Sequence, residues 1–280
     1  MASTKKLFAK LRRRGPYRVL RGDLAFAGQP GIVYTPASGF NLPGVAFAHD
    51  WLTPAHSYED TLEHLASWGI VAAAPDTEKG LAPSVLNLAY DLGTTLDIIT
   101  GVRLGPGQIS VHPNKLGVAG HGFGGSAAVF AAAGAPSRVK VVAPLFPSVT
   151  APRAEEPAAG LTAKGLVLTA PGDQMTLRSN AVELARVWKS GTLRLVSGGV
   201  AGGLVEGRRL ARAVGLPGAD TGTQKTVRAL LTGFLLAELA GKREYQDFAD
   251  PEAVLPKTEP ADLTEDSVDL ESRVVALLKP

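Results

Sequence analysis

The sequence contains no cysteine among its 280 residues, so disulfides, thiolate nucleophiles and cysteine metal ligands are excluded. It also lacks any apolar run of roughly 20 residues, the length that a helix needs to cross a bilayer. An apolar region typical of a secretory signal is missing too, because the basic start of the chain leads into a polar, glycine-containing stretch after Arg21. We therefore expect a cytoplasmic protein with no membrane span.

Acidic residues are absent from positions 1–21, which carry eight of the 29 Lys and Arg residues. The other positions hold 21 basic and 26 acidic residues, so the net charge of +3 combines a basic N-terminal segment with an acidic remainder. Within 4–14, one side of a predicted helix carries the apolar residues Leu7, Phe8 and Leu11. Basic side chains surround them at Lys5, Lys6, Lys10, Arg12, Arg13 and Arg14.

The basic amphipathic arm, residues 1–15, has the composition of a segment that contacts an anionic membrane or an acidic protein. Near an anionic lipid surface each basic residue contributes about 1 kcal/mol of binding free energy. The inner face of the cell membrane and an unknown protein partner are therefore both candidates, and a solubilising tail is the alternative. Nucleic acid is not expected, because no aromatic interleaving or recognised nucleic-acid module accompanies the arginines.

Apolar runs typical of buried strands alternate with helical patterns along most of the chain. After a strand-rich meander at 17–34, strands are expected at 45–49, 70–74, 116–119, 139–145, 165–169 and 192–196. Helices are expected at 58–68, 84–100, 123–133, 177–188 and 226–240. This alternation predicts an α/β domain, residues 16–255, with a mostly parallel central sheet and helices on both faces. Residues 256–280 are expected to form an acidic tail with a short helix.

A serine is missing from the turn at 120–125, which reads Gly-His-Gly-Phe-Gly-Gly between an expected strand and an expected helix. In α/β-hydrolases the sequence G-x-S-x-G occupies such a turn, the nucleophile elbow, and presents the catalytic serine. Gly122 stands at the position of that serine. Glycine adopts the strained backbone of the elbow readily, but it brings no atom that can attack a carbonyl. The three glycines Gly120, Gly122 and Gly125 also match a dinucleotide-binding spacing, although the acidic residue expected about 20 positions later is absent.

The elbow and several longer stretches resemble the dienelactone-hydrolase-like branch of the α/β-hydrolase superfamily, which includes actinobacterial polyester hydrolases and cutinase-like lipases. The likeness covers residues 17 to about 255 and is strongest at 17–36, 47–77, 120–125 and 234–251. The resemblance implies an α/β-hydrolase fold. It also implies descent from enzymes that cleave carboxylic esters with a Ser, Asp and His triad.

The resemblance places the triad positions at Gly122, Asp173 and a residue near Ala201, so only the acid remains. The five histidines all precede Asp173 and are His49, His56, His64, His112 and His121. No general base can therefore come from the usual loop, and the family's mechanism has lost both its nucleophile and its base. We expect no catalytic residues. Ser126, one helical turn past the elbow, is a poor substitute nucleophile because it is expected to point into packing.

Candidate pocket residues flank these positions. His49, Asp50 and Trp51 stand where the family forms its oxyanion hole, and an acidic side chain there would repel a developing oxyanion. The segment is expected to form a reshaped ligand pocket or, alternatively, a structural loop in which His49 bonds to backbone. The other candidate pocket residues are His121, Phe123 and Met175. No cofactor and no metal are expected, because histidines and carboxylates from separate loops show no ligand spacing.

The sequence as a whole favours a catalytically inactive α/β-hydrolase homologue that acts as a binding or scaffold protein, peripheral to the membrane if the arm binds lipid. One alternative is a weak or serine-independent carboxylic-ester hydrolase in which Asp50 or Asp173 positions a water. A further alternative is a sensor that holds a small molecule in the vestigial pocket.

Overall fold

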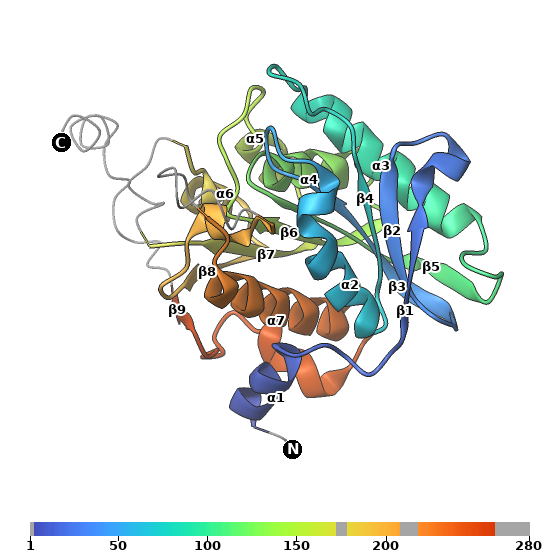
Figure 1. Ribbon diagram of the computed structural model, residues 1–280. Coiled ribbons are helices and arrows are strands. Elements are labelled where there is room, and N and C mark those ends of the chain that lie inside the picture. The colour runs from blue at the N-terminus through green and yellow to red at the C-terminus, as the bar shows by residue number, and fades with distance from the viewer. Residues whose placement is uncertain (1–2, 172–177, 208–217, 261–280) are drawn as a thin grey trace.

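The computed structural model describes residues 3–171, 178–207 and 218–260 (Figure 1). Within these ranges nine strands form one sheet: β1 (Val19–Asp23), β2 (Gly31–Pro36), β3 (Gly39–Ala48), β4 (Val71–Pro75), β5 (Ile109–His121), β6 (Val139–Leu145), β7 (Lys164–Thr169), β8 (Gly191–Val196) and β9 (Thr258–Pro260). Their order is β1-β2-β4-β3-β5-β6-β7-β8-β9. Strands β3 to β8 run parallel, whereas β2 is antiparallel to β1 and β4, and β9 is antiparallel to β8.

Helices cover both faces of this sheet (Figure 1). The α-helices are α1 (Thr4–Leu11), α2 (Glu59–Ser67), α3 (Val85–Gly101), α4 (Phe123–Gly134), α5 (Glu155–Ala158), α6 (Ala181–Val187) and α7 (Thr221–Glu238). Short 3-10 helices include η1 (Leu24–Ala27), η2 (Ala55–Tyr58), η4 (Ala201–Leu204) and η6 (Arg243–Phe248). Along β3, Val45 and Phe47 pack with α1, α2 and α7, while Ala46 and Ala48 pack with α3 and α4. A strand buried on both faces gives this alternation, and the predicted α/β architecture is confirmed.

Helix α1 packs against α7 and η6 and is part of the domain (Figure 1). Leu7, Phe8 and Leu11 are at most 5% exposed. The expectation that these three side chains contact a membrane or a partner is therefore not met, because the domain itself covers the apolar face of the helix. The basic side chains that stay on the surface include Lys5, Lys6, Lys10, Arg13 and Arg14. None of the helices within the described ranges has the length and apolar character needed to cross a membrane.

Strand β9 extends the sheet beyond the predicted domain boundary at residue 255. It pairs with β8 through Thr258, Glu259 and Pro260, which the sequence assigned to the acidic tail. A three-residue edge strand that contains proline has no periodic pattern to reveal it. The expected helix of the tail lies outside the described residues.

The connections of the sheet change direction between β3 and β5. The chain leaves β3 toward β4 on one side, whereas it leaves β5 toward β6 on the other. In open α/β sheets the carboxyl ends of two such neighbouring strands border a crevice where ligands bind. His49, Asp50 and Trp51 directly follow β3, and Gly122 directly follows β5, so the topology brings the two predicted segments to this crevice.

Candidate functional site

The turn between β5 and α4 has a backbone geometry that favours glycine. Gly122 has φ 52° and ψ −117°, a left-handed conformation that costs other residues on the order of 1–3 kcal/mol. Two residues later, a Cβ on Gly124 would stand 2.4 Å from the carbonyl oxygens of Ala48 and His49. The end of β3 and the start of α4 therefore approach each other closely enough for side chains of one loop to reach the backbone of the other.

The carboxylate of Asp50 occupies the space above Gly122. Its Oδ1 accepts hydrogen bonds from the backbone N–H of Trp51 at 2.8 Å and of Phe123 at 2.9 Å. A Cβ on Gly122 would stand 2.1 Å from the same oxygen. Two backbone donors that converge on one oxygen are the arrangement with which acyl-transfer enzymes stabilise an oxyanion. The sequence predicted that Asp50 would repel such an anion, and in the structure the Asp50 carboxylate itself binds these two donors.

His121 is buried beside the elbow and faces away from the solvent. Its Nε2 lies 3.0 Å from the carbonyl oxygen of Ala201 and its Nδ1 lies 2.8 Å from the hydroxyl of Tyr58. Because a carbonyl can only accept, Nε2 carries the hydrogen and Nδ1 accepts from Tyr58, whose oxygen in turn accepts from the N–H of Asp50 at 3.2 Å. Both nitrogens of the imidazole are therefore engaged. His121 was expected to line the pocket, but it is not among the residues that line the cleft.

His49 is fully buried and also lies away from the cleft. Its Nδ1 is 2.9 Å from the carbonyl oxygen of Asp50, and its Nε2 is 2.7 Å from that of Thr77. The ring thus lies between a backbone carbonyl of the loop after β3 and one of the loop after β4, as in the structural-loop alternative for His49.

A cleft of about 600 Å³ opens in front of the elbow. From the predicted pocket it includes Asp50, Trp51 and Phe123, whereas Asp173 and Met175 lie outside the described residues. Sequence reasoning missed the other lining residues, which are Leu81, Pro83, Ser148, Val149 and Arg178. Most of these come from loops that follow β4 and β6, so the rule that ligands bind at the carboxyl ends of parallel strands could have pointed to them.

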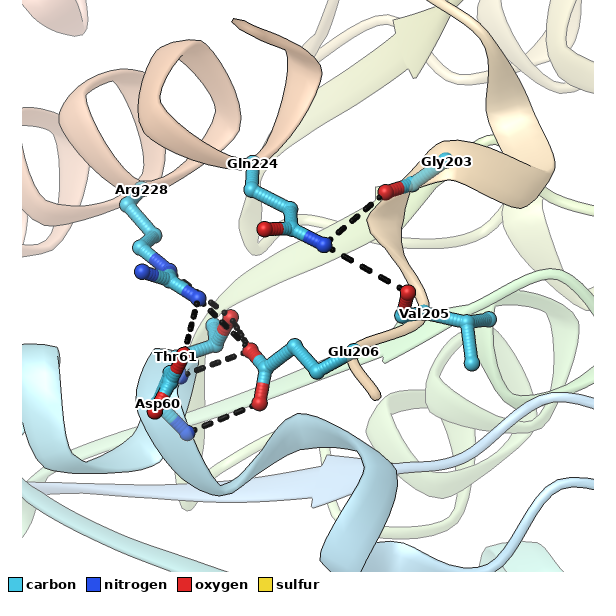
Figure 2. Close-up of polar contacts among 7 residues, drawn as sticks. All are labelled: Asp60, Thr61, Gly203, Val205, Glu206, Gln224 and Arg228. Atoms are coloured by element: carbon cyan, nitrogen blue, oxygen red, sulfur yellow. Dashed lines mark hydrogen bonds and ion pairs between the residues drawn. The ribbon is translucent and has the colours of Figure 1, made fainter. Parts of the chain in front are cut away.

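Helix α7 holds the segment at the expected histidine position (Figure 2). The side-chain amide of Gln224 donates to the carbonyl oxygens of Gly203 at 3.1 Å and Val205 at 3.4 Å. Ala201, at the start of this segment, accepts the hydrogen bond from His121. The carbonyl of Ala201, rather than a side chain, therefore faces the elbow from this segment.

Glu206 joins the end of the same segment to α2 and α7 (Figure 2). Its carboxylate accepts from the N–H groups of Asp60 at 2.8 Å and Thr61 at 3.0 Å, and from the guanidinium of Arg228 at 2.8 Å. These N–H groups belong to the first turn of α2, which otherwise lacks acceptors for them. Burial raises the pKa of Glu206, whereas Arg228 and the hydrogen bonds from α2 counteract that rise.

Neither a metal centre nor a known family is evident at this site. Among the residues that the structure describes, no group of three or more His, Asp or Glu side chains could hold a metal ion. No protein-family model matches the chain, and no curated protein matches it.

Proposed function

We propose that the chain is a catalytically inactive α/β-hydrolase homologue, of the dienelactone-hydrolase-like branch, that acts as a binding protein. The observation that carries this proposal is the position of Asp50 against Gly122. One carboxylate fills the place of the missing serine side chain and also binds the two N–H groups that an ester's oxyanion would need. The mostly parallel sheet and the strand-to-helix elbow support the assignment of the fold.

Each group that a triad hydrolase uses for ester hydrolysis is either missing here or engaged in another contact. Gly122 supplies no nucleophile, and the nearest hydroxyl in α4, on Ser126, is fully buried and donates to the carbonyl oxygen of Ser148. The imidazole of His121 is engaged by Tyr58 and by a backbone carbonyl. Loss of nucleophile, base and oxyanion donors together leaves little of the rate enhancement of a triad hydrolase.

The cleft has the composition of a site for a small molecule with an apolar body. Trp51, Leu81 and Val149 are exposed apolar side chains at the cleft, and Leu81 is 82% exposed. Arg178 and Asp50 add one charge of each sign to the lining. Apolar walls with a few polar groups are typical of ligand pockets, and exposed apolar clusters mark binding surfaces.

The test combines an activity assay with a binding assay on the full chain. We expect no turnover of p-nitrophenyl esters of short and medium chain length above the rate in buffer. With medium-chain carboxylic acids and their esters as probes, we expect a rise in melting temperature that Leu81→Ser reduces. Val254→Ser is the matched control, because Val254 is equally exposed but lies away from the cleft. Ester hydrolysis that disappears in the Asp50→Asn variant would overturn the proposal.

The second candidate function is weak ester hydrolysis through a water held by Asp50. The observation that favours it is the exposure of this carboxylate, whose side chain is 31% accessible and borders the cleft. Its Oδ2 is 4.0 Å from Nδ1 of His121, whereas Oδ1 is the oxygen that accepts from the two N–H donors. The Asp50→Asn assay separates this candidate from the binding protein.

A further inference from the structure

A second pocket lies where α1, α2 and α7 meet, and it shares no lining residue with the cleft at the elbow. Its volume is about 180 Å³, and its lining residues are Arg12, Arg14, Asp60, Glu63, His64, Lys225 and Arg228. The volume is several times the roughly 30 Å³ that one water occupies in the liquid, so it suits a compact polar group.

The lining of this pocket has an excess of positive charge. Arg14 pairs with Glu63 at 3.1 Å, and Arg228 pairs with Asp60 at 3.5 Å and with Glu206. Arg12 and Lys225 have no ion pair with any residue that the structure describes. Two cations therefore remain unneutralised in the lining, one at the end of α1 and one on α7.

His64 and Arg12 also place unsatisfied polar atoms at the pocket. His64 is only 6% exposed, its ring bonds to the backbone of Leu11, and its Nε2 has no hydrogen-bond partner within the described ranges. The buried Nε of Arg12 also has no hydrogen-bond partner among the residues that the structure describes. Buried polar atoms nearly always have a partner, so these atoms indicate that the pocket receives a group able to bond to them.

The protonation state of His64 determines whether a group bound in the pocket must donate or accept a hydrogen bond at Nε2. Burial and, to a smaller extent, the positive charge of Arg228 lower the pKa of His64 to about 4, although the hydrogen bond to Leu11 opposes the shift. At pH 6 the ring is neutral, and because one nitrogen donates to Leu11, Nε2 presents a lone pair. The ligand must therefore be an anion that also donates a hydrogen bond.

We infer that this pocket binds a phosphate monoester group, either on a soluble molecule or on a lipid headgroup. The guanidinium of Arg12 and the ammonium of Lys225 provide charge-assisted hydrogen bonds to its oxygens. A P–O–H group on the same phosphate donates to Nε2 of His64. Sulfate has no proton at pH 6 and a phosphodiester has no P–O–H group, so the pocket discriminates against both. The inference does not depend on the function of the elbow cleft.

The experiment measures binding of inorganic phosphate and of sulfate to the full chain at pH 6 by isothermal titration calorimetry. Near this pH a substantial fraction of a phosphate monoester keeps its second proton. We expect saturable binding of phosphate, at least about tenfold tighter than that of sulfate. Arg12→Gln and Lys225→Gln should each weaken phosphate binding about tenfold or more. Lys189→Gln removes the same charge from an exposed residue on the other face of the sheet and should leave binding unchanged.

His64→Gln tests the donor requirement, and vesicles distinguish the two sources of phosphate. The His64→Gln variant should lose the preference for phosphate over sulfate, and the exposed Lys225 provides an independent test if that variant does not fold. Sedimentation is measured with vesicles of phosphatidic acid, a phosphate monoester, and with vesicles of phosphatidylcholine, a phosphodiester. Binding to the first alone, lost on substitution of Arg12 or Lys225, assigns the site to a lipid headgroup. Phosphate binding without vesicle binding assigns it to a soluble monoester. Absence of phosphate binding, equal affinity for sulfate, or equal weakening by Lys189→Gln would overturn the inference.

Discussion

Asp50 Oδ1 lies 2.1 Å from the point at which a Cβ on Gly122 would stand. A side chain at position 122 and the Asp50 carboxylate in its present place therefore exclude each other. The carboxylate can keep this place only while residue 122 is glycine. A serine at position 122 would therefore displace the carboxylate and release the two N–H groups that it holds. The glycine at this turn and the contact between the two loops depend on each other.

A double-mutant cycle measures this coupling. Gly122→Ala should destabilise the protein through backbone strain, on the order of 1–3 kcal/mol, and through overlap with Asp50. In an Asp50→Ala background only the strain remains, so the double variant should be more stable than the sum of the single changes by about 1 kcal/mol or more. Urea unfolding gives the free energies. Gly93→Ala in α3, where a Cβ meets open space, is the control and should not destabilise. Strict additivity would contradict the coupling.

The two N–H donors held by Asp50 predict a difference between its substitutions. Asp50→Asn keeps an acceptor oxygen for Trp51 and Phe123, whereas Asp50→Ala leaves both donors without one. Each unsatisfied donor costs about 1–3 kcal/mol where water cannot reach it. We expect Asp50→Ala to lower the free energy of unfolding more than Asp50→Asn, as measured by urea denaturation. Equal losses would show that the hydrogen bonds from the two loops do not stabilise the fold.

The ion pair between Glu206 and Arg228 is largely buried, with 10% and 15% of the side chains exposed. Arg228→Met leaves the carboxylate without its cation and should cost about 3–5 kcal/mol. Replacing both residues with Met should cost less than the single change, because no buried charge remains uncompensated. Thermal unfolding of the two variants checks the order. A double variant that is less stable than Arg228→Met would show that the hydrogen bonds to α2 dominate.

His64 predicts an acid-sensitive stability. Its pKa in the folded state is about 4, below the ordinary value of 6.5, so the unfolded chain takes up the proton first. The stability contribution is complete above pH 6.5 and falls by about 3 kcal/mol as the pH drops to 4. Unfolding in urea at pH 7 and pH 5 should therefore show a smaller change for His64→Gln than for the wild type. His56→Gln, at an exposed position, should keep the wild-type slope.

The docked position of α1 predicts that its apolar side chains stabilise the whole domain. Leu11 is fully buried, and Leu11→Ala should cost about 2–5 kcal/mol. Lys6→Ala on the exposed side of the same helix should change stability by no more than about 0.5 kcal/mol. Chemical denaturation compares the two. A negligible effect of Leu11→Ala would show that the helix does not remain docked in solution.

Periodicity predicted the central elements of the fold well. Strand β6 occupies the expected residues, and β7, β8, α3 and α4 differ from expectation by one or two residues at their ends. These elements are buried, so the hydrophobic pattern that defines them is the one that packing requires. The glycines of the elbow likewise marked the turn correctly, because glycine adopts a positive φ more readily than any other residue.

The relationships between distant segments could not be predicted in this way. Asp50 and Gly122 meet only because β3 and β5 are neighbours in the sheet, and neither residue has a local pattern that reports the other. The pattern of α1 predicted an apolar face but not what covers it, because a helix that packs on a membrane and a helix that packs on α7 need the same apolar residues. The cleft residues Leu81 and Val149 lie in loops whose paths are set by the loops' own packing.

The docking of α1 has a consequence for the newly made chain. Its apolar face rests on α7 and η6, and the hydroxyl of Thr4 donates to Asp247, so the site that receives α1 is translated near the end of the described chain. At about 5–20 residues per second, roughly 10–40 s separate the synthesis of the two. During that interval Leu7, Phe8 and Leu11 lack the cover that α7 and η6 provide in the folded domain. The apolar face of α1 is therefore fully covered only after α7 has been made and has packed against it, and the folded domain presents the surrounding basic side chains.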